Sequence, residues 1–202
     1  MPVLAIVAGP NGSGKTTLVR NGGLDGFVDP PFVCLNADDI ARMFAAGGQP
    51  SDAQSLLAAQ MCDGLLDGRI AAGESVVVET VLSSGKLKSR VLAARAAGFR
   101  IVLVYVSVKT VELNVARVAN RRVLGGHGVP PQRIVDRRAR SHAMFAWFAR
   151  EADRVVVFDN SLPEPFVVAF KDRETWTLRH LEALASDLAA AIRTLAAPRP
   201  TP

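Results

Sequence analysis

Short runs of apolar, β-branched residues alternate along the chain with longer stretches in which apolar residues recur every three or four positions. The short runs predict five strands, over 3–8, 32–35, 75–78, 101–106 and 155–158. These runs are continuously apolar, which is typical of strands that are covered on both faces. The longer stretches predict helices near 15–20, 39–46, 52–72, 86–97, 111–123 and 132–151. This alternation predicts an α/β fold, a parallel sheet with helices on both faces.

The pattern changes toward the C-terminus. Two apolar segments, 166–170 and 175–178, are separated by a polar turn and predict a hairpin, and a helix rich in Ala and Leu follows over 180–196. Residues 198–202 are predicted to form a flexible tail. Because no linker or repeat interrupts 1–197, we predict a single domain over that range.

Composition narrows the class of protein. Hydrophobic residues make up 49% of the 202 residues, which is ample for a core. No apolar run approaches the roughly 20 residues that a membrane-spanning helix needs, so we expect a cytoplasmic protein with no membrane partner. The two cysteines, Cys34 and Cys62, lack metal-ligand spacing and sit among apolar residues, which predicts two buried thiols.

The net charge of +5 arises in one segment. Residues 117–140 contain seven arginines and a single acid, Asp136, so the segment contributes +6 and the rest of the chain −1. A basic protein is a candidate nucleic-acid binder. A charge confined to one segment is better explained by a bound triphosphate, and we do not expect nucleic acid to be a partner.

Directly after the first predicted strand, the sequence GPNGSGKT matches the phosphate-loop pattern G-x-x-x-x-G-K-[ST] at every constrained position. Glycines let the backbone turn its N–H groups toward a phosphate, and the following helix adds its positive N-terminal end. Lys15 is expected to reach the β- and γ-phosphates of ATP, and the Thr16 hydroxyl to bind Mg²⁺. This motif predicts a P-loop NTPase. The expected nucleotide-binding residues are Gly9, Pro10, Asn11, Gly12, Ser13, Gly14, Lys15, Thr16 and Thr17.

Carboxylates follow the predicted strands at the sheet edge where α/β proteins bind ligands. Asp38 comes just after the second strand and is the predicted catalytic base for an acceptor hydroxyl, with Asp39 in the first turn of the next helix. The alternative is that both aspartates only cap that helix. Glu79 is interpreted either as a carboxylate near Mg²⁺ or, together with Thr80, as a substrate contact. Asp159 follows the fifth strand and is either a base contact or part of a turn.

Two predicted helices flank a glycine-rich loop in the basic segment and predict an Arg-rich helical lid over about 111–150. Arg117 and Arg121 lie four residues apart on the first helix, and Arg137 lies on the second. Arginine pairs bidentately with phosphate and stabilises the charge that spreads over a γ-phosphate during transfer. We predict catalytic roles for Arg117 and Arg121, a nucleotide contact for Arg137, and a substrate contact for His127 at the tip of the loop. The alternatives are a solvated basic helix pair and, for His127, a polar residue that the glycine-rich loop merely tolerates.

Taken together, these motifs resemble the zeta-toxin family of P-loop kinases, in particular its short bacterial branch. The resemblance covers roughly residues 1–161 and is carried by the phosphate loop, Asn36-Ala37-Asp38-Asp39-Ile40, Val78-Glu79-Thr80, and the arginine lid ending in Asp159-Asn160-Ser161.

The resemblance implies a nucleoside-kinase-like sheet and ATP- and Mg²⁺-dependent phosphorylation of a hydroxyl on a UDP-activated amino sugar, such as UDP-N-acetylglucosamine. It also implies that Asp38 is the catalytic base, that Lys15 contacts the phosphates and that Glu79 contacts the substrate. An antitoxin protein from a neighbouring gene is the macromolecular partner that it suggests.

Two other functions fit the same motifs. One is a regulatory NTPase whose basic segment binds a protein or a nucleic acid and phosphorylates no small molecule. The other is a polynucleotide 5′-kinase. The chain has a single tyrosine, Tyr105, and scattered phenylalanines, so it lacks an aromatic platform on which bases would stack. An ATP-dependent kinase that acts on an alcohol group is therefore the leading hypothesis.

Overall fold

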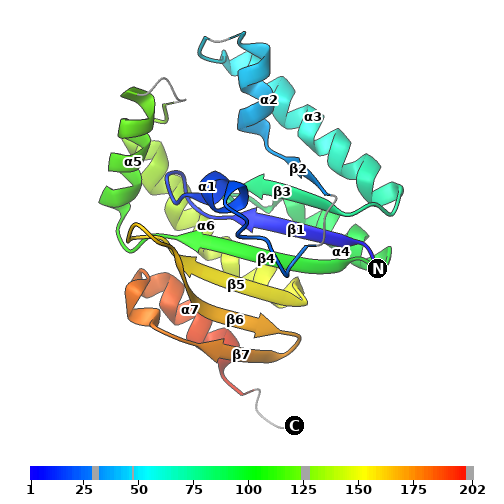
Figure 1. Ribbon diagram of the computed structural model, residues 1–202, viewed down its shortest axis with the longest axis vertical. Helices are drawn as coiled ribbons and strands as arrows, with labels where there is room; N and C mark the ends of the chain where they lie inside the picture. The colour runs from blue at the N-terminus through cyan, green and yellow to red at the C-terminus, as the bar shows by residue number, and fades with distance from the viewer. Residues whose placement is uncertain (29–31, 47, 124–127, 199–202) are drawn as a thin grey trace.

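The computed structural model describes residues 1–28, 32–46, 48–123 and 128–198. The described residues form a seven-stranded sheet with helices on both faces (Figure 1). The strand order is β2-β3-β1-β4-β5-β6-β7. The first five strands in that order run parallel, and β6 and β7 are added antiparallel at one edge. The predicted fold class, a largely parallel α/β sheet with a C-terminal hairpin and helix, is confirmed.

The strands are β1 (Val3–Ala8), β2 (Val33–Leu35), β3 (Val76–Thr80), β4 (Arg100–Ser107), β5 (Arg154–Asp159), β6 (Phe166–Asp172) and β7 (Thr175–Leu178). The helices are α1 (Lys15–Arg20), α2 (Ala37–Phe44), α3 (Asp52–Ala71), α4 (Lys88–Ala96), α5 (Val111–Val123), α6 (Pro131–Glu151) and α7 (Ser186–Ala196). Two short 3₁₀ turns, Gly85–Leu87 and Leu181–Ala183, precede α4 and α7.

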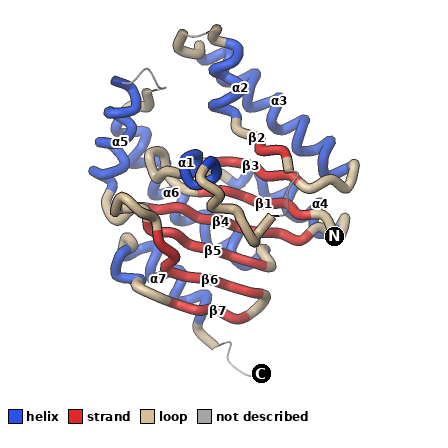
Figure 2. Tube along the Cα trace, viewed as in Figure 1, coloured by secondary structure: helices blue, strands red, loops and turns tan. Residues whose placement is uncertain are grey.

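The sheet has a core on each face, as the continuously apolar strands predict. All six residues of β1 are buried, and alternate ones face opposite sides. On one face, β1 packs with side chains of α3, α4, α6 and α7, which include Leu66, Val91, Phe145 and Leu188. On the other face, it packs with Leu18 of α1 and with the segment that follows α1. Figure 2 shows α5 with α6, and α2 with α3, on either side of α1.

Local signals define most of the boundaries. Ser51 caps α3 in a reciprocal capping box with Gln54, and Gly73 and Gly98 take positive φ angles just beyond α3 and α4. Several boundaries differ from the predicted ones, and the starts of two helices have a clear local cause. Helix α2 begins at Ala37, because the Asn36 side chain caps it, and α7 begins only at Ser186, after the 3₁₀ turn.

One burial prediction is wrong. Cys62 is buried in the core, but Cys34 is exposed because β2 is a three-residue strand at the edge of the sheet. The single-domain range 1–197 stays a prediction, and most of the predicted tail lies outside the described residues. Within the described ranges, no helix combines the length and the apolar character that crossing a membrane requires.

Candidate active site

The phosphate loop connects β1 to α1, and its backbone requires glycine. Gly9, Gly12 and Gly14 have φ angles of 144°, 73° and 95°, in a region that L side chains rarely adopt. A Cβ atom on Gly9 would lie 2.0 Å from the Val106 carbonyl oxygen, and one on Gly14 would lie 2.1 Å from the Asn160 amide nitrogen. The loop is therefore packed directly against the ends of β4 and β5.

Two asparagines from distant parts of the chain hold the loop. Asn114 Nδ2 donates to the carbonyl oxygen of Asn11, and Asn160 Nδ2 donates to the carbonyl oxygen of Ser13. The donor–acceptor distance is 2.8 Å in both hydrogen bonds. The carbonyl and the N–H of a trans peptide point in opposite directions. The N–H groups that follow these two carbonyls therefore point away from the asparagines. Neither asparagine was predicted to contact the loop, since the phosphate-loop motif carries no signal for partners 103 and 147 residues away.

Polar atoms inside the loop suit a bound phosphate. Ser13 Oγ and Asn11 Oδ1 are buried and have no hydrogen-bond partner among the described residues. Lys15 is also buried, and its Nζ donates to the carbonyl oxygens of Gly9, at 2.9 Å, and Pro10, at 3.1 Å. Buried hydrogen-bonding groups without partners are uncommon in folded proteins. The Ser13 hydroxyl and the Lys15 ammonium can donate to nucleotide phosphates, as the loop sequence predicts, whereas Asn11 Oδ1 only accepts and is not a phosphate contact.

The electrostatic surroundings of Lys15 bring several predicted residues together. Burial lowers the pKa of Lys15 below its ordinary value, and the charge of Arg121 lowers that pKa further. The carboxylates of Glu79 and Asp38 oppose the shift and raise the Lys15 pKa. Three of the predicted residues, from α5, β3 and α2, thus lie close enough to act on the lysine of the loop.

Thr16 and Glu79 form a direct pair at the loop. Thr16 Oγ1 donates to the Glu79 carboxylate, at 2.7 Å to Oε1, and Asn36 Nδ2 donates to Oε2 at 2.9 Å. The pair forms because β3 lies next to β1, with Thr80 opposite Ala8. A hydroxyl and a carboxylate side by side are suitable oxygen ligands for Mg²⁺ or its waters. Among the described residues, no group of three His, Cys, Asp or Glu side chains gathers at this or any other place.

Asp38 lies in the first turn of α2, not between the strand and the helix as predicted. The Asn36 side chain caps the helix by accepting from the Asp38 backbone N–H, so both Asp38 and Asp39 fall in the first turn. Asp39 pairs with Arg42. Asp38 is exposed, and no described residue hydrogen-bonds to its carboxylate. Its charge raises the pKa of Arg137, although burial keeps that pKa below its ordinary value.

The arginines of the basic segment differ in how far they are buried. Arg117 and Arg137 are half-buried and Arg121 is exposed, whereas Arg138 is buried and bonds to the backbone at the end of β4. Arg138 therefore does not belong to a solvated basic surface. The prediction for His127 lies outside the described residues.

The structure also places Thr80, Thr17 and Asp159, which the sequence analysis singled out. Thr80 Oγ1 accepts from the Leu82 backbone N–H at 3.0 Å, and Thr17 is exposed on α1. Asp159 accepts from the backbone N–H and the hydroxyl of Ser161, so it forms the turn that was one of its two predicted roles.

A separate hollow of about 450 Å³ lies between α5 and α6 and is lined by residues such as Val118. It includes no residue of the phosphate loop.

Comparisons with known proteins agree with this arrangement. The model of a family described as an AAA domain matches residues 4–145. A search of curated proteins finds no match. Among solved structures, a chain of the AvrRxo1-ORF1:-ORF2 complex with ATP gives a TM-score of 0.68 at 18% identity, and the match covers 100% of this chain and 65% of that chain. The protein described here thus spans less than two thirds of that relative.

Two other solved structures share the fold. A chain of the PezAT chromosomal toxin-antitoxin system of Streptococcus pneumoniae gives a TM-score of 0.61 at 14% identity, covering 96% of this chain and 78% of that one. A chain of the Pnkp1/Rnl/Hen1 RNA repair complex gives a TM-score of 0.56 at 21% identity, and the match covers 71% of this chain and 45% of that chain. Since the family model spans well over half of its residues, the chain belongs to the AAA domain family, and it has a P-loop NTPase-type fold.

Proposed function

We propose that this protein is an ATP-dependent kinase that phosphorylates a hydroxyl group of a small molecule. The observation that carries the proposal is a second carboxylate at the loop. Glu79 is engaged by Thr16, whereas Asp38 acts on the Lys15 pKa without a hydrogen-bond partner among the described residues. An NTPase that only hydrolyses ATP needs a residue that orients water, and a kinase needs a carboxylate that faces an acceptor.

In this proposal the acceptor hydroxyl lies between Asp38 and the γ-phosphate of ATP. The hydroxyl oxygen forms a bond to the γ-phosphorus as the bond from that phosphorus to the bridging oxygen breaks, and ADP leaves. The proton of the hydroxyl passes to the Asp38 carboxylate, from which it returns to solvent. The loop N–H groups and Lys15 hold the phosphates in line.

The arginines and the Thr16–Glu79 pair complete the proposed site. Arg117, Arg121 and Arg137 stabilise the charge that develops on the transferred phosphoryl group. Thr16 and Glu79 would hold Mg²⁺. When bound there, that ion would neutralise charge on the β- and γ-phosphates. The contact between Thr16 and Glu79 favours this role for Glu79 over the alternative role in substrate binding.

The acceptor that we propose is a UDP-activated amino sugar such as UDP-N-acetylglucosamine. This rests on the resemblance to zeta toxins and is supported by the shared fold with a chain of the PezAT toxin-antitoxin system. Thr80 and His127 are then the remaining candidates for contacts to the sugar nucleotide. The same two observations support an antitoxin protein as the macromolecular partner.

The proposal is tested by incubating the protein with labelled ATP, Mg²⁺ and separate acceptors. The panel contains UDP-sugars, free nucleosides and 5′-hydroxyl oligonucleotides. We expect label on a UDP-amino sugar and on no oligonucleotide. Label on an oligonucleotide alone would instead support the polynucleotide kinase alternative. ATP hydrolysis at one rate with every acceptor would contradict the kinase proposal altogether.

A further inference from the structure

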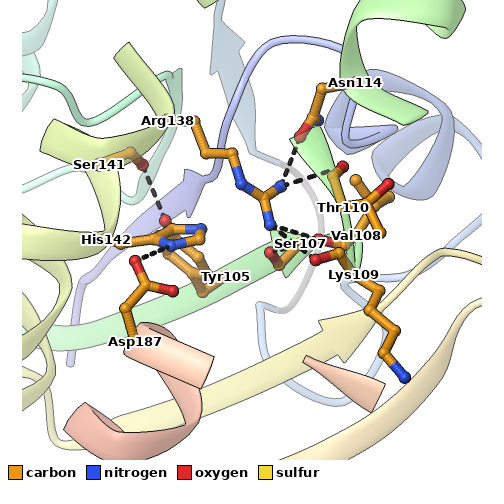
Figure 3. A network of polar contacts seen from close by, with 10 residues as sticks. All are labelled: Tyr105, Ser107, Val108, Lys109, Thr110, Asn114, Arg138, Ser141, His142 and Asp187. Carbon is orange, nitrogen blue, oxygen red and sulfur yellow. Dashed lines mark hydrogen bonds and ion pairs between the residues drawn. The ribbon is translucent and has the colours of Figure 1, made fainter. Parts of the chain in front are cut away.

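Arg138 is an arginine of the basic segment whose side chain is turned into the protein. It is 6% exposed, and its guanidinium lies at the end of β4 (Figure 3). Nη2 donates to the carbonyl oxygens of Val108, at 2.9 Å, and Lys109, at 3.0 Å, and Nη1 donates to Asn114 Oδ1. All of these acceptors are neutral. The fork of the guanidinium is thus used to join α6 to the β4–α5 connection and to α5 itself.

Asn114 continues this chain of contacts to the phosphate loop. Its side chain is fully buried, with Oδ1 accepting from Arg138 and Nδ2 donating to the Asn11 carbonyl oxygen. Arg138 has no acceptor atom, so it holds the Asn114 amide in the orientation that aims the NH₂ group at the loop. The contact is close, because a Cβ atom on Gly12 would lie 2.6 Å from the Asn114 backbone oxygen.

We propose that Arg138 and Asn114 are positioning residues that set the conformation of the phosphate loop from α6. The inference rests on the proposed function and deepens it. The two residues hold the carbonyl of Asn11 toward Asn114, so the Gly12 N–H points the other way, into the loop. In the proposed function, that N–H faces the bound phosphate. Arg137, the neighbouring residue on α6, is a proposed phosphate contact. Adjacent arginines on one helix thus have different roles.

The arrangement also couples two parts of the site. The hydrogen bonds of Arg138 connect α6, through Asn114, to the loop that receives the nucleotide. Through these contacts a displacement of α6 would be transmitted to the loop, and nucleotide binding would favour the position of α6 in which the contacts form. This reciprocity follows from linkage between two sites that share one set of contacts.

The first test replaces Asn114 with aspartate. Asn114→Asp keeps the oxygen that Arg138 binds but replaces the NH₂ group that binds the loop. We expect a folded protein with faster hydrogen–deuterium exchange of the amides in 9–16 in the absence of nucleotide. Binding of ADP, followed by calorimetry, should weaken by at least about tenfold, because the variant loses one buried hydrogen bond and places a carboxylate oxygen against the Asn11 carbonyl oxygen. Asn120→Asp, an exposed change on the same helix, is the matched control and should alter neither quantity.

The second test replaces Arg138 with lysine, which keeps the charge and removes the fork. Arg138→Lys should also speed exchange in 9–16, whereas Arg140→Lys, at an exposed position two residues away, should not. If Arg138 were instead a phosphate ligand, Arg138→Lys would lower ATP affinity and leave exchange in the nucleotide-free protein unchanged. That result, or unchanged exchange in both Asn114→Asp and Arg138→Lys, would overturn the inference.

These outcomes are separable from failure of the proposed function. The exchange measurement needs neither nucleotide nor acceptor, and the binding measurement needs no acceptor. A wild-type protein that binds ADP but phosphorylates nothing would refute the kinase proposal while leaving the positioning roles of Arg138 and Asn114 to be read from exchange.

Discussion

At the scale of single residues, the phosphate loop is predictable in identity but not in its supports. The motif predicts Gly9, Gly14, Lys15 and Thr16 because each constrained position has its own chemical reason. It does not reveal that Asn114 holds the loop, because that hydrogen bond depends on how α5 meets β1 in three dimensions. The pairing of Thr16 with Glu79 was predictable in part. Both residues were predicted to lie at the active edge, and the contact follows from the neighbouring positions of β1 and β3.

The first prediction concerns Gly14, whose Cβ position is filled by the Asn160 amide. Gly14→Ala should abolish ADP binding in calorimetry and lower the free energy of unfolding, because it combines a positive φ with a direct clash. Gly64→Ala in α3 is the control, since nothing lies within 4 Å of a Cβ atom at that position. This control should stabilise the protein by about 1 kcal/mol, because alanine favours helix more than glycine does. Equal affinities for ADP in the two variants would contradict the described loop.

At the scale of elements, the strands were predictable because burial on both faces leaves continuous apolar runs. Helix α2 starts two residues before the predicted position, because Asn36 caps it. The joint between α6 and α7 was not predictable at all. There, His142 Nδ1 lies 2.7 Å from Asp187 Oδ2, with the histidine side chain buried. Burial lowers the pKa of His142, against the opposing effect of Asp187, whose own pKa is lowered by the histidine.

The second prediction is that acid weakens this joint. The unfolded chain takes up a proton at His142 near pH 6.5, whereas the folded chain resists protonation until a lower pH. Stability is therefore fully present above about pH 6.5 and is lost as the pH falls toward the folded-state pKa. Urea unfolding at pH 7.5 and 5.5 should show a smaller loss for His142→Gln than for the wild type. His180→Gln, an exposed control, should behave like the wild type. An identical loss in wild type and His142→Gln would refute the assignment.

At the scale of the whole molecule, the predicted fold class and the observed one agree. The structure also shows that the arginines of the basic segment differ in burial. Of the seven arginines in 117–140, three are assigned to the proposed site and Arg138 is buried in the fold. The remaining three, Arg122, Arg133 and Arg140, are exposed. Counting charges along a sequence does not separate these uses, because burial depends on the packing of α6 against β4 and α5. The motifs also do not identify the acceptor, because they predict contacts to phosphate and metal and none of them is specific for a sugar.

The third prediction is that nucleotide binding stabilises the whole chain through Lys15. At an ATP concentration of 100 times the Kd, with Mg²⁺, the free energy of unfolding should rise by about 2.7 kcal/mol. Lys15→Ala should show a far smaller rise, because it removes the buried amine of the loop, whereas the exposed control Lys86→Ala should match the wild type. Chemical unfolding with and without nucleotide measures this difference. Equal stabilisation of Lys15→Ala and the wild type would contradict the proposed binding mode.

The most direct test of the kinase proposal compares two neighbouring carboxylates. Asp38→Asn and Asp39→Asn make the same chemical change in the same helical turn, and only Asp38 is assigned to the acceptor. With the acceptor identified by the labelling panel, ADP release that depends on the acceptor should fall by about 10²- to 10⁴-fold in Asp38→Asn. The same rate in Asp39→Asn should remain close to that of the wild type. An Asp38→Asn variant that retains the wild-type acceptor-dependent rate would contradict Asp38 as the base and the mechanism built on it.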